Sequence, residues 1–278
     1  MSLSFTRYQL LTITAILSLL INGCSSSRYS QSHYSAPSAD IDVSNITNPV
    51  PRAEPRSKYG NPSSYVVRGK RYYVMNSSTG YVERGIASWY GTKFHGERTS
   101  SGEPYNMYAM TAAHKSLPLP TYVEVRNLQN GRTVTVKVND RGPFVNNRII
   151  DLSYTAAKKL GITGNGTGMV EIRAIDPYHK PVTQPVMASK PLPSAQENTI
   201  QAQLYLQVGA FQNRQNAERL RSRLEDLVIS DIGIKDGYEK QKLIYRVRIG
   251  PLASVDEADR MADKLITHGF NDSRIIID

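Results

Sequence analysis

The sequence has a single cysteine and no long hydrophobic run. One Cys in 278 residues excludes, within one chain, a disulfide framework, an iron–sulfur site and a multi-Cys zinc cluster. The one strongly apolar run, Leu10 to Ile21, is far shorter than the ~20 residues that span a bilayer. Hydrophobic residues make up 40% and charged residues 21%, which excludes a charge-dominated disordered chain. At least one packed core is therefore expected, and the length suggests about two domains.

The sequence also lacks the signatures of cofactor and metal sites. It contains no phosphate-cradling glycine-rich motif, and its 5 His are dispersed, with no His/Glu pair at helical spacing. We therefore expect no cofactor and no metal. Charge of one sign is in excess: 34 Lys and Arg against 24 Asp and Glu give +10, which favours an anionic partner. Residues 1–23 contribute +1, residues 24–80 +4 and residues 81–175 +5, while the rest of the chain is neutral.

The lone Cys24 follows the apolar run directly after Asn22-Gly23. With Arg7 as a short basic segment before the run, residues 1–23 are typical of an export signal. Ile21 to Cys24 resembles the lipobox of bacterial lipoproteins, which implies a lipid anchor on the Cys sulfur. The alternative is an incidental Cys after an ordinary signal peptide. Ser25 resembles the residue that sorts enterobacterial lipoproteins to the outer membrane, so the resemblance implies an anchored protein that faces the periplasm.

Two segments have the composition of linkers. Residues 24–80 are rich in Ser, Pro, Asn, Arg and Tyr without apolar periodicity, and we expect a mostly disordered tether. Residues 176–199 carry five prolines, which favours an extended, disordered linker. Two folded regions remain, residues 81–175 and 200–278.

The first folded region has the pattern of short strands. Apolar and polar residues alternate over 122–126 and 133–138, and Asn130-Gly131 between them is a hairpin signal. Ser153 can cap a short helix that runs to Leu160 and ends at Gly161. Residues 170–173 alternate again as a closing strand. Short strands with one short helix predict a small all-β barrel.

Six motifs in this region occur in a characteristic order: ASWYG, FHG, TSSGE, MTAAH, VNDRGPF and DLS, between residues 87 and 153. Their succession resembles the double-psi β-barrel of the rare lipoprotein A family, over about residues 85–174. That barrel is related to expansins, and studied members of the family include peptidoglycan lytic transglycosylases. The resemblance implies an enzyme that cleaves the MurNAc-GlcNAc β-1,4 bond endolytically and leaves 1,6-anhydro-MurNAc ends.

Breaking a glycosidic bond needs a proton for the leaving oxygen and stabilisation of an oxocarbenium-like centre, which carboxyl groups usually supply. The positions that match the family motifs are Glu103, His114 and Asp140. We interpret Asp140 as the acid/base, because a strand that ends in a Gly-Pro turn puts it at a barrel rim. Glu103 is then the second carboxylate and His114 a hydrogen-bond or charge partner. Asp151 is a competing candidate, since its motif also resembles the acidic motif of expansins, although it can instead cap the following helix.

Two aromatic residues of the ASWYG motif are candidates for substrate binding. Trp89, the only Trp in the chain, and Tyr90 can either stack on sugar rings or belong to the core. The sequence does not distinguish these roles.

The second folded region repeats itself after 41 residues, which aligns Gly209 with Gly250 and Leu224 with Leu265. Each half reads as a strand, a glycine turn and an amphipathic helix, and Ser254 begins a capping-box pattern. With strands at 233–239 and 274–277, the order is βαββαβ, a small α+β domain of the ferredoxin or RNP-like type.

That layout also suits an RNA-binding domain, but residues 200–278 hold 12 basic and 12 acidic side chains and no aromatic-rich RNP-like strand. We therefore expect no nucleic acid partner. The segments 205–211 and 245–251 instead resemble the SPOR domain, which implies binding to septal glycan strands stripped of stem peptides. Five residues are candidates to line its sheet or rim: Gln207, Phe211, Tyr245, Arg246 and Arg248. Core packing is the favoured role for Phe211.

Both resemblances imply the same polymer as partner. Together they predict a lipid-anchored endolytic transglycosylase that prefers denuded peptidoglycan at the division septum, where divisome proteins are possible further partners. The alternative is a non-catalytic, expansin-like or scaffold protein that binds peptidoglycan.

Overall fold

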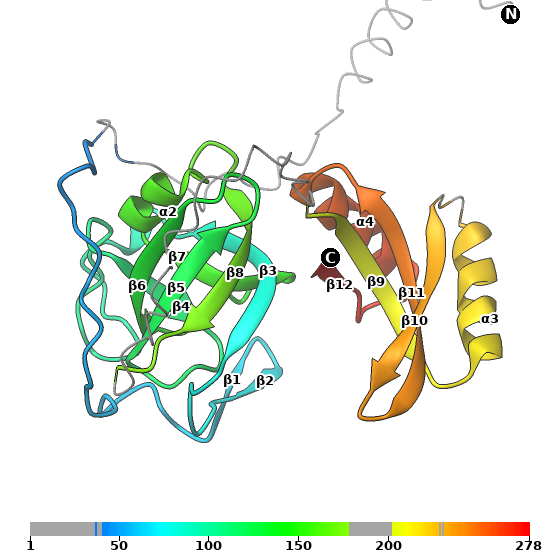
Figure 1. Ribbon diagram of the computed structural model, residues 1–278, viewed down its shortest axis with the longest axis horizontal. Coiled ribbons are helices and arrows are strands. Elements are labelled where there is room, and N and C mark those ends of the chain that lie inside the picture. Colours follow the sequence, from blue (N-terminus) through cyan, green and yellow to red (C-terminus); the bar gives the residue numbers. More distant parts are fainter. Residues whose placement is uncertain (1–36, 38–40, 178–201, 228, 230) are drawn as a thin grey trace, which may run out of the picture. The chain divides into compact units, whose positions relative to one another are not determined.

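The computed structural model describes residues 37, 41–177, 202–227, 229 and 231–278, and two folded regions lie within them (Figure 1). The predicted export signal, Cys24 and nearly all of the predicted linker lie outside the described residues. Within the described ranges, no helix has both the length and the apolar character needed to cross a membrane.

The first region is a closed six-stranded barrel in the order β3-β7-β4-β6-β5-β8, which confirms the predicted barrel. β3 with β7 and β4 with β6 run parallel, whereas the other four neighbouring pairs are antiparallel. The strand bounds are Val82–Trp89 (β3), Thr111–His114 (β4), Thr121–Asn127 (β5), Thr133–Asp140 (β6), Arg148–Leu152 (β7) and Thr167–Ala174 (β8). A short 3-10 turn, η2 (Thr92–Phe94), follows β3.

The local signals of this region act as predicted. β5 and β6 pair antiparallel around Gly131, whose φ of 71° is the left-handed conformation that a tight hairpin needs. The valines of both strands are buried, and Glu124 faces solvent. Helix α2 (Tyr154–Leu160) begins at Ser153, whose side chain accepts a hydrogen bond from the Ala156 N–H. It ends at Gly161 in the left-handed conformation, so both predicted caps are confirmed.

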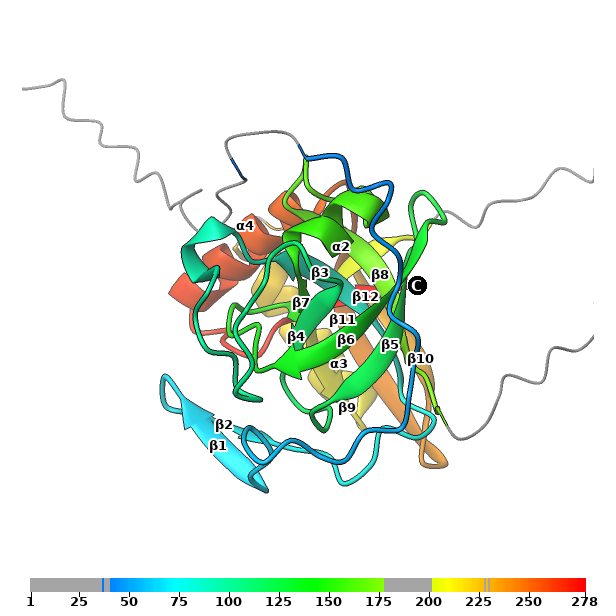
Figure 2. The same ribbon diagram turned by 90° about the vertical axis from the view of Figure 1, so that its left-hand side faces the viewer.

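The segment before the barrel differs from the disordered tether that its composition predicts. Residues 64–73 form a hairpin of β1 (Ser64–Val67) and β2 (Lys70–Tyr73). Residues 41–63, here called the strap, run beside β5 and β6 and lead to this hairpin (Figure 2). The described part of the predicted tether is therefore part of the barrel domain.

Side chains and carbonyl groups hold the strap in place, which is why apolar periodicity does not reveal it. The Lys159 ammonium of α2 donates to the carbonyls of Val43 and Ile46 at 2.9 and 2.6 Å. The Ser57 N–H donates to the Leu119 carbonyl at 2.9 Å, and the Asn61 amide bonds to both the N–H and the carbonyl of Leu119 at 2.8 Å. Such polar contacts leave no periodic pattern in the sequence.

The C-terminal region has the predicted βαββαβ order, with an antiparallel sheet ordered β10-β11-β9-β12. Its elements are β9 (Leu204–Phe211), α3 (Arg214–Glu225), β10 (Ile232–Glu239), β11 (Lys242–Leu252), α4 (Val255–Thr267) and β12 (Arg274–Ile277). Leu206 and Val247 of the sheet pack with Leu224 of α3 and Leu265 of α4 in one hydrophobic cluster.

The sequence predicts that the two aligned glycines of the repeat form turns between strand and helix, and this prediction is wrong. Gly209 lies inside β9 and Gly250 inside β11, where the β9–β11 register shifts. A Cβ on Gly209 would lie 2.7 Å from the Leu220 side chain, so this glycine lets α3 approach the sheet closely. The capping prediction is confirmed, since the Ser254 side chain accepts a hydrogen bond from the Glu257 N–H.

Candidate active site

Asp140 is the last residue of β6 and is half-buried. Its Oδ1 accepts three hydrogen bonds: from the Ser100 N–H at 2.8 Å, the Ser100 hydroxyl at 2.7 Å and the Arg141 N–H at 2.7 Å. Three donors on one oxygen suit an ionised carboxylate, which only accepts hydrogen bonds. The strand end thus holds a carboxylate in a fixed orientation at the rim.

The loop of the TSSGE motif places Ser100 within hydrogen-bond distance of this carboxylate. The N–H and the hydroxyl of Thr99 both donate to the Glu103 carbonyl at 2.8 Å, which closes the loop on itself. The Ser101 N–H donates to the Asn139 carbonyl at 3.2 Å and ties the loop to the end of β6. Gly102 turns the loop with a φ of 97°, a conformation that favours glycine.

Asp151 lies in β7, two strands away from Asp140. Ala113 of β4 pairs with Asp140 on one side and with Asp151 on the other, so the two aspartates flank one residue. Neighbouring strands are about 4.8 Å apart, which places the two Cα atoms roughly 10 Å apart. Carboxyl groups that act on a glycosidic bond are about 5 to 9.5 Å apart, a span that two side chains from these positions can adopt.

The environment of Asp151 raises its affinity for a proton. Burial raises the pKa of Asp151 above its ordinary value, and the negative charge of Asp140 adds to this, against the hydrogen bond from Ser88 and the charges of Arg148 and Lys115. The Ser88 hydroxyl of β3 donates to Asp151 Oδ1. The site therefore holds one carboxyl group with a raised pKa beside another that accepts three hydrogen bonds.

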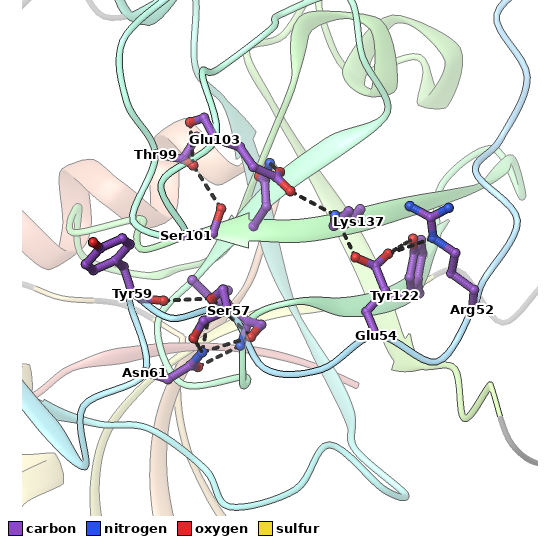
Figure 3. A network of polar contacts seen from close by, with 12 residues as sticks. Arg52, Glu54, Ser57, Tyr59, Asn61, Thr99, Ser101, Glu103, Tyr122 and Lys137 are labelled. Carbon is purple, nitrogen blue, oxygen red and sulfur yellow. Dashed lines mark hydrogen bonds and ion pairs between the residues drawn. The ribbon is translucent and has the colours of Figure 1, made fainter.

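Glu103 belongs to a polar network on the strap side of the barrel (Figure 3). Its carboxylate accepts hydrogen bonds from Lys137 at 2.9 Å and from Asn139 at 2.7 Å. Burial raises the pKa of Glu103, but these two hydrogen bonds and the Lys137 charge outweigh it and lower the pKa. Lys137 also bonds to Glu54 of the strap at 3.1 Å, and Glu54 accepts from the Tyr122 hydroxyl. Glu103 thus forms an ion pair with Lys137, whereas the hydrogen-bond donors to Asp140 and Asp151 are hydroxyl and backbone N–H groups.

His114 is buried, and its ring is occupied by structural hydrogen bonds. Nδ1 accepts from the backbone N–H groups of Ser116 and Leu117 at 3.1 and 3.0 Å, which places the ring proton on Nε2. Nε2 lies 3.1 Å from the Tyr81 hydroxyl, which in turn donates to Glu83. Burial lowers the pKa of His114, although Glu83 opposes this. These contacts shape the turn after β4 and make Ser116, Leu117 and Tyr81 the hydrogen-bond partners of the ring.

The structure places both aromatic residues of the ASWYG motif in the barrel core. Trp89 is 3% exposed and packs edge-on against Tyr154. Tyr90 is stacked on Tyr105 with ring centroids 4.0 Å apart, and burial raises its pKa, with the charges of Tyr105, Asp140 and Asp151 adding to this. Their burial is that of core residues, which leaves little ring surface for a sugar.

Sequence reasoning did not single out Ser88, Ser100 and Arg141 as parts of the site. Arg141 donates to the carbonyls of Leu117 at 2.6 Å and Gly60 at 2.9 Å, so it joins the strap to the turn after β4. Ser100 and Arg141 stand inside motifs whose acidic residues drew attention, and only strand pairing reveals that Ser88 reaches Asp151. For Ser100 and Arg141, a hydroxyl or amide donor close to a candidate carboxyl in the sequence is the signal that could have identified them.

The five candidate residues of the C-terminal domain separate onto two faces of its sheet. Gln207 and Arg248 are paired across β9 and β11 and alternate with the buried Leu206 and Val247, so they lie on the face away from the helices. Arg248 bonds to Asp278 at 2.8 Å. Arg246 bonds to Glu239 at 3.2 Å.

Phe211 and Tyr245 pair with each other across β9 and β11, and both pack against the hydrophobic cluster of the domain. Core packing is thus the observed role of Phe211. On the sheet, Tyr205, Lys235, Arg248 and Asp278 contribute to a shallow pocket.

A closed six-stranded barrel with two aspartates on either side of Ala113, in a chain that also carries a βαββαβ domain, defines a two-domain protein of the double-psi barrel class. Residues 82–172 match the family described as lytic transglycolase, and residues 201–275 match the SPOR domain family. Curated relatives named endolytic peptidoglycan transglycosylase RlpA are similar over most of the chain. The one from Pseudomonas aeruginosa is 41% identical and covers 85% of this chain and 82% of its own length. The one from Vibrio cholerae is 38% identical and covers 94% of both chains.

The chain therefore belongs to the RlpA family, as its motifs predict. Among solved structures, the RlpA SPOR domain from Pseudomonas aeruginosa is 34% identical, with a TM-score of 0.25, and covers 26% of this chain and 96% of its own.

Proposed function

We propose that this protein is an endolytic peptidoglycan transglycosylase that cleaves the MurNAc-GlcNAc β-1,4 bond and leaves 1,6-anhydro-MurNAc ends. The observation that carries the proposal is the pair of aspartates on either side of Ala113, one held as an acceptor and one with a raised pKa. The names of the relatives support the same reaction.

Asp151 acts as the acid and then as the base in this proposal. Its protonated carboxyl donates to the glycosidic oxygen of the leaving GlcNAc, and the bond between that oxygen and C1 of MurNAc breaks. The C6 hydroxyl of the same MurNAc attacks C1 and returns its proton to the Asp151 carboxylate. No water is consumed, and the enzyme regains its initial protonation state. The raised pKa of Asp151 favours it over Asp140, which the sequence suggested for this role.

Asp140 stabilises the positive charge that develops at C1, because its hydrogen bonds with Ser100 and Arg141 hold a carboxylate in place. Glu103, engaged by Lys137 and Asn139, orients the TSSGE loop and can reach a sugar substituent at the rim. His114 acts as a positioning residue through the turn after β4 in this proposal.

The C-terminal domain binds glycan in this proposal. Arg246 and Arg248, on the face of the sheet away from the helices, offer guanidinium donors to a strand that bears carboxylate groups, while Gln207 beside Arg248 is buried and supports that face. Glycan stripped of stem peptides exposes these carboxylates, so a preference for denuded septal peptidoglycan follows. A lipid on Cys24 would anchor the protein in the outer membrane facing the periplasm, with divisome proteins as further partners.

A digest of sacculi tests the proposal. The chain from Ser25 to Asp278 is incubated with intact sacculi and with amidase-stripped sacculi, and anhydro-muramyl ends are measured by mass spectrometry. We expect release from stripped sacculi and little from intact ones. If the chain pellets with sacculi and releases no anhydro ends, the non-catalytic, expansin-like alternative replaces the enzyme.

A further inference from the structure

The strap turns sharply at Ser57–Asn61, and this turn is fastened to the barrel at both of its ends. The Ser57 N–H and the Asn61 amide both donate to the Leu119 carbonyl, and Asn61 also accepts from the Leu119 N–H. Within the turn, the Ser57 hydroxyl donates to the Tyr59 carbonyl at 2.7 Å. The residues between the two ends are therefore presented in a defined conformation.

The middle of the turn lies against the two residues that hold Asp140. Gly60 has a φ of 80°, and a Cβ at this position would lie 2.6 Å from the Ser100 carbonyl oxygen. The Arg141 guanidinium donates to the Gly60 carbonyl at 2.9 Å. Since Ser100 and Arg141 are the donors to Asp140, the turn borders the candidate active site directly.

Tyr59 is the large side chain that this turn leaves open to solvent. It is 54% exposed, and its ring lies over Gly102 of the TSSGE loop, 3.3 Å from the position that a Cβ would take. Figure 3 shows the ring pointing away from the hydrogen bonds that fasten the turn. The Lys58 ammonium is 5.4 Å from the centre of the same ring. An exposed ring at a rigid position next to a candidate catalytic loop is the arrangement that binds the apolar face of a sugar.

We propose that Tyr59 and Lys58 form a glycan subsite beside Asp140, in which the ring stacks on a sugar of the strand and the ammonium pairs with a lactyl carboxylate. The subsite rests on the proposed transglycosylase function and adds a specificity determinant to it. A muramic residue whose stem peptide has been removed carries a free carboxylate, whereas an intact stem converts it to a neutral amide. Lys58 therefore favours denuded glycan within the barrel domain itself, independently of the C-terminal domain.

The test measures steady-state release of anhydro ends from soluble denuded glycan oligomers by the chain from Ser25 to Asp278. Tyr59→Ala should raise KM about tenfold with kcat within about threefold, because stacking contributes to binding in both ground and transition states. Tyr59→Phe should keep KM within about twofold. Tyr59→Leu fills the space over Gly102 without a flat ring, and should raise KM like Tyr59→Ala. Tyr73→Ala is the matched control, since Tyr73 is a 68% exposed tyrosine of the β1–β2 hairpin.

The role of Lys58 is tested by comparing activity on oligomers with free lactyl carboxylates and on oligomers whose lactyl carboxylates are methyl esters. The wild type should prefer the free acid at low salt, and Lys58→Gln should reduce that preference about threefold. Lys70→Gln is its control, because Lys70 also lies over a tyrosine ring, that of Tyr72.

The results that would disprove the subsite differ from the result that would disprove the transglycosylase function. If the KM of Tyr59→Ala equals that of Tyr73→Ala, or if Tyr59→Leu restores the wild-type KM, stacking on Tyr59 is wrong while the transglycosylase stands. If Lys58→Gln keeps the full preference for the free acid, the charge pairing is wrong. If the wild-type chain releases no anhydro ends from any substrate, the proposed function itself is wrong.

Discussion

The barrel and the C-terminal domain differ in how many polar side chains they bury. The barrel buries polar groups such as Ser88, His114 and Asn139, whereas in the described part of the C-terminal domain Gln207 is the one buried polar side chain. Charged residues of the C-terminal domain instead pair at its surface, as Lys235 does with Asp278. Burial perturbs proton affinity, whereas charges paired at the surface stay in contact with solvent. Under the proposed function, proton transfer takes place in the barrel and the C-terminal domain recognises the glycan.

The largest expected effect comes from the aspartate pair. Asp151→Asn and Asp140→Asn should each lower the release of anhydro ends by about 10²- to 10⁴-fold, the usual contribution of general acid–base or charge-stabilising groups. Activity of the wild type should fall as the pH rises through the raised pKa of Asp151. If Asp151→Asn retains wild-type rates while Asp140→Asn does not, the acid/base is Asp140.

The same substitution at Asp151 should stabilise the fold. Burial raises its folded-state pKa above the unfolded value, so between the two values the native state binds more protons and stability falls as the pH rises. Above this window Asp151→Asn removes a buried charge and should raise the free energy of unfolding by about 0.5–2 kcal/mol, with a higher Tm. A lower Tm of Asp151→Asn above this window would contradict the expectation that the buried carboxylate destabilises the fold.

The next effect in size concerns the contact between the strap and the TSSGE loop. Gly60→Ala should lower stability by about 2–3 kcal/mol and reduce activity, because its Cβ meets the Ser100 carbonyl at a positive φ. Gly69→Ala is the matched control, since Gly69 has a φ of 76° and no atom within 4 Å of the added Cβ. Denaturant unfolding of both variants measures the difference. Equal losses would mean that backbone conformation alone, and not the contact with Ser100, sets the cost.

Removing the strap carboxylate should cost less. The hydrogen bonds from Tyr122, Arg52 and Lys137 outweigh burial and lower the pKa of Glu54 to about 2. Its stabilisation is present above the ordinary pKa near 4.5 and is lost as the pH falls toward 2. Glu54→Gln should lower the free energy of unfolding by about 1–3 kcal/mol at pH 7 and less at pH 3. Glu124→Gln on the exposed face of β5 should change stability by less than about 0.5 kcal/mol.

The smallest effect is expected in the C-terminal domain. Arg248→Ala should weaken pelleting with stripped sacculi about threefold to tenfold, since one guanidinium among several groups is lost. Release of anhydro ends from soluble oligomers should be unchanged. Arg214→Ala, on the exposed side of α3, should alter neither measurement. A loss of activity on soluble oligomers in Arg248→Ala would contradict the division of labour between the two domains.

Local signals in the sequence predicted much of both folds. Asn130-Gly131, the Ser153 cap, the Gly161 stop and the Ser254 capping box each depend on neighbours within a few residues. Their structural effect can be read without knowing the rest of the chain. The 41-residue repeat likewise predicted the βαββαβ order, although it misplaced Gly209 and Gly250 into turns.

The sequence by itself therefore determined the elements, the domain order and the family motifs, because capping, hairpin turns and alternation are local. Only the tertiary structure decided which carboxyl groups meet. Asp140 and Asp151 are brought to the two sides of Ala113 by strand order in a closed barrel, which no spacing along the chain specifies. The strap was likewise invisible in the sequence, since hydrogen bonds to carbonyls such as that of Leu119 hold it. Such hydrogen bonds depend on the position of backbone groups that are far away in the sequence, so amino-acid composition does not predict them.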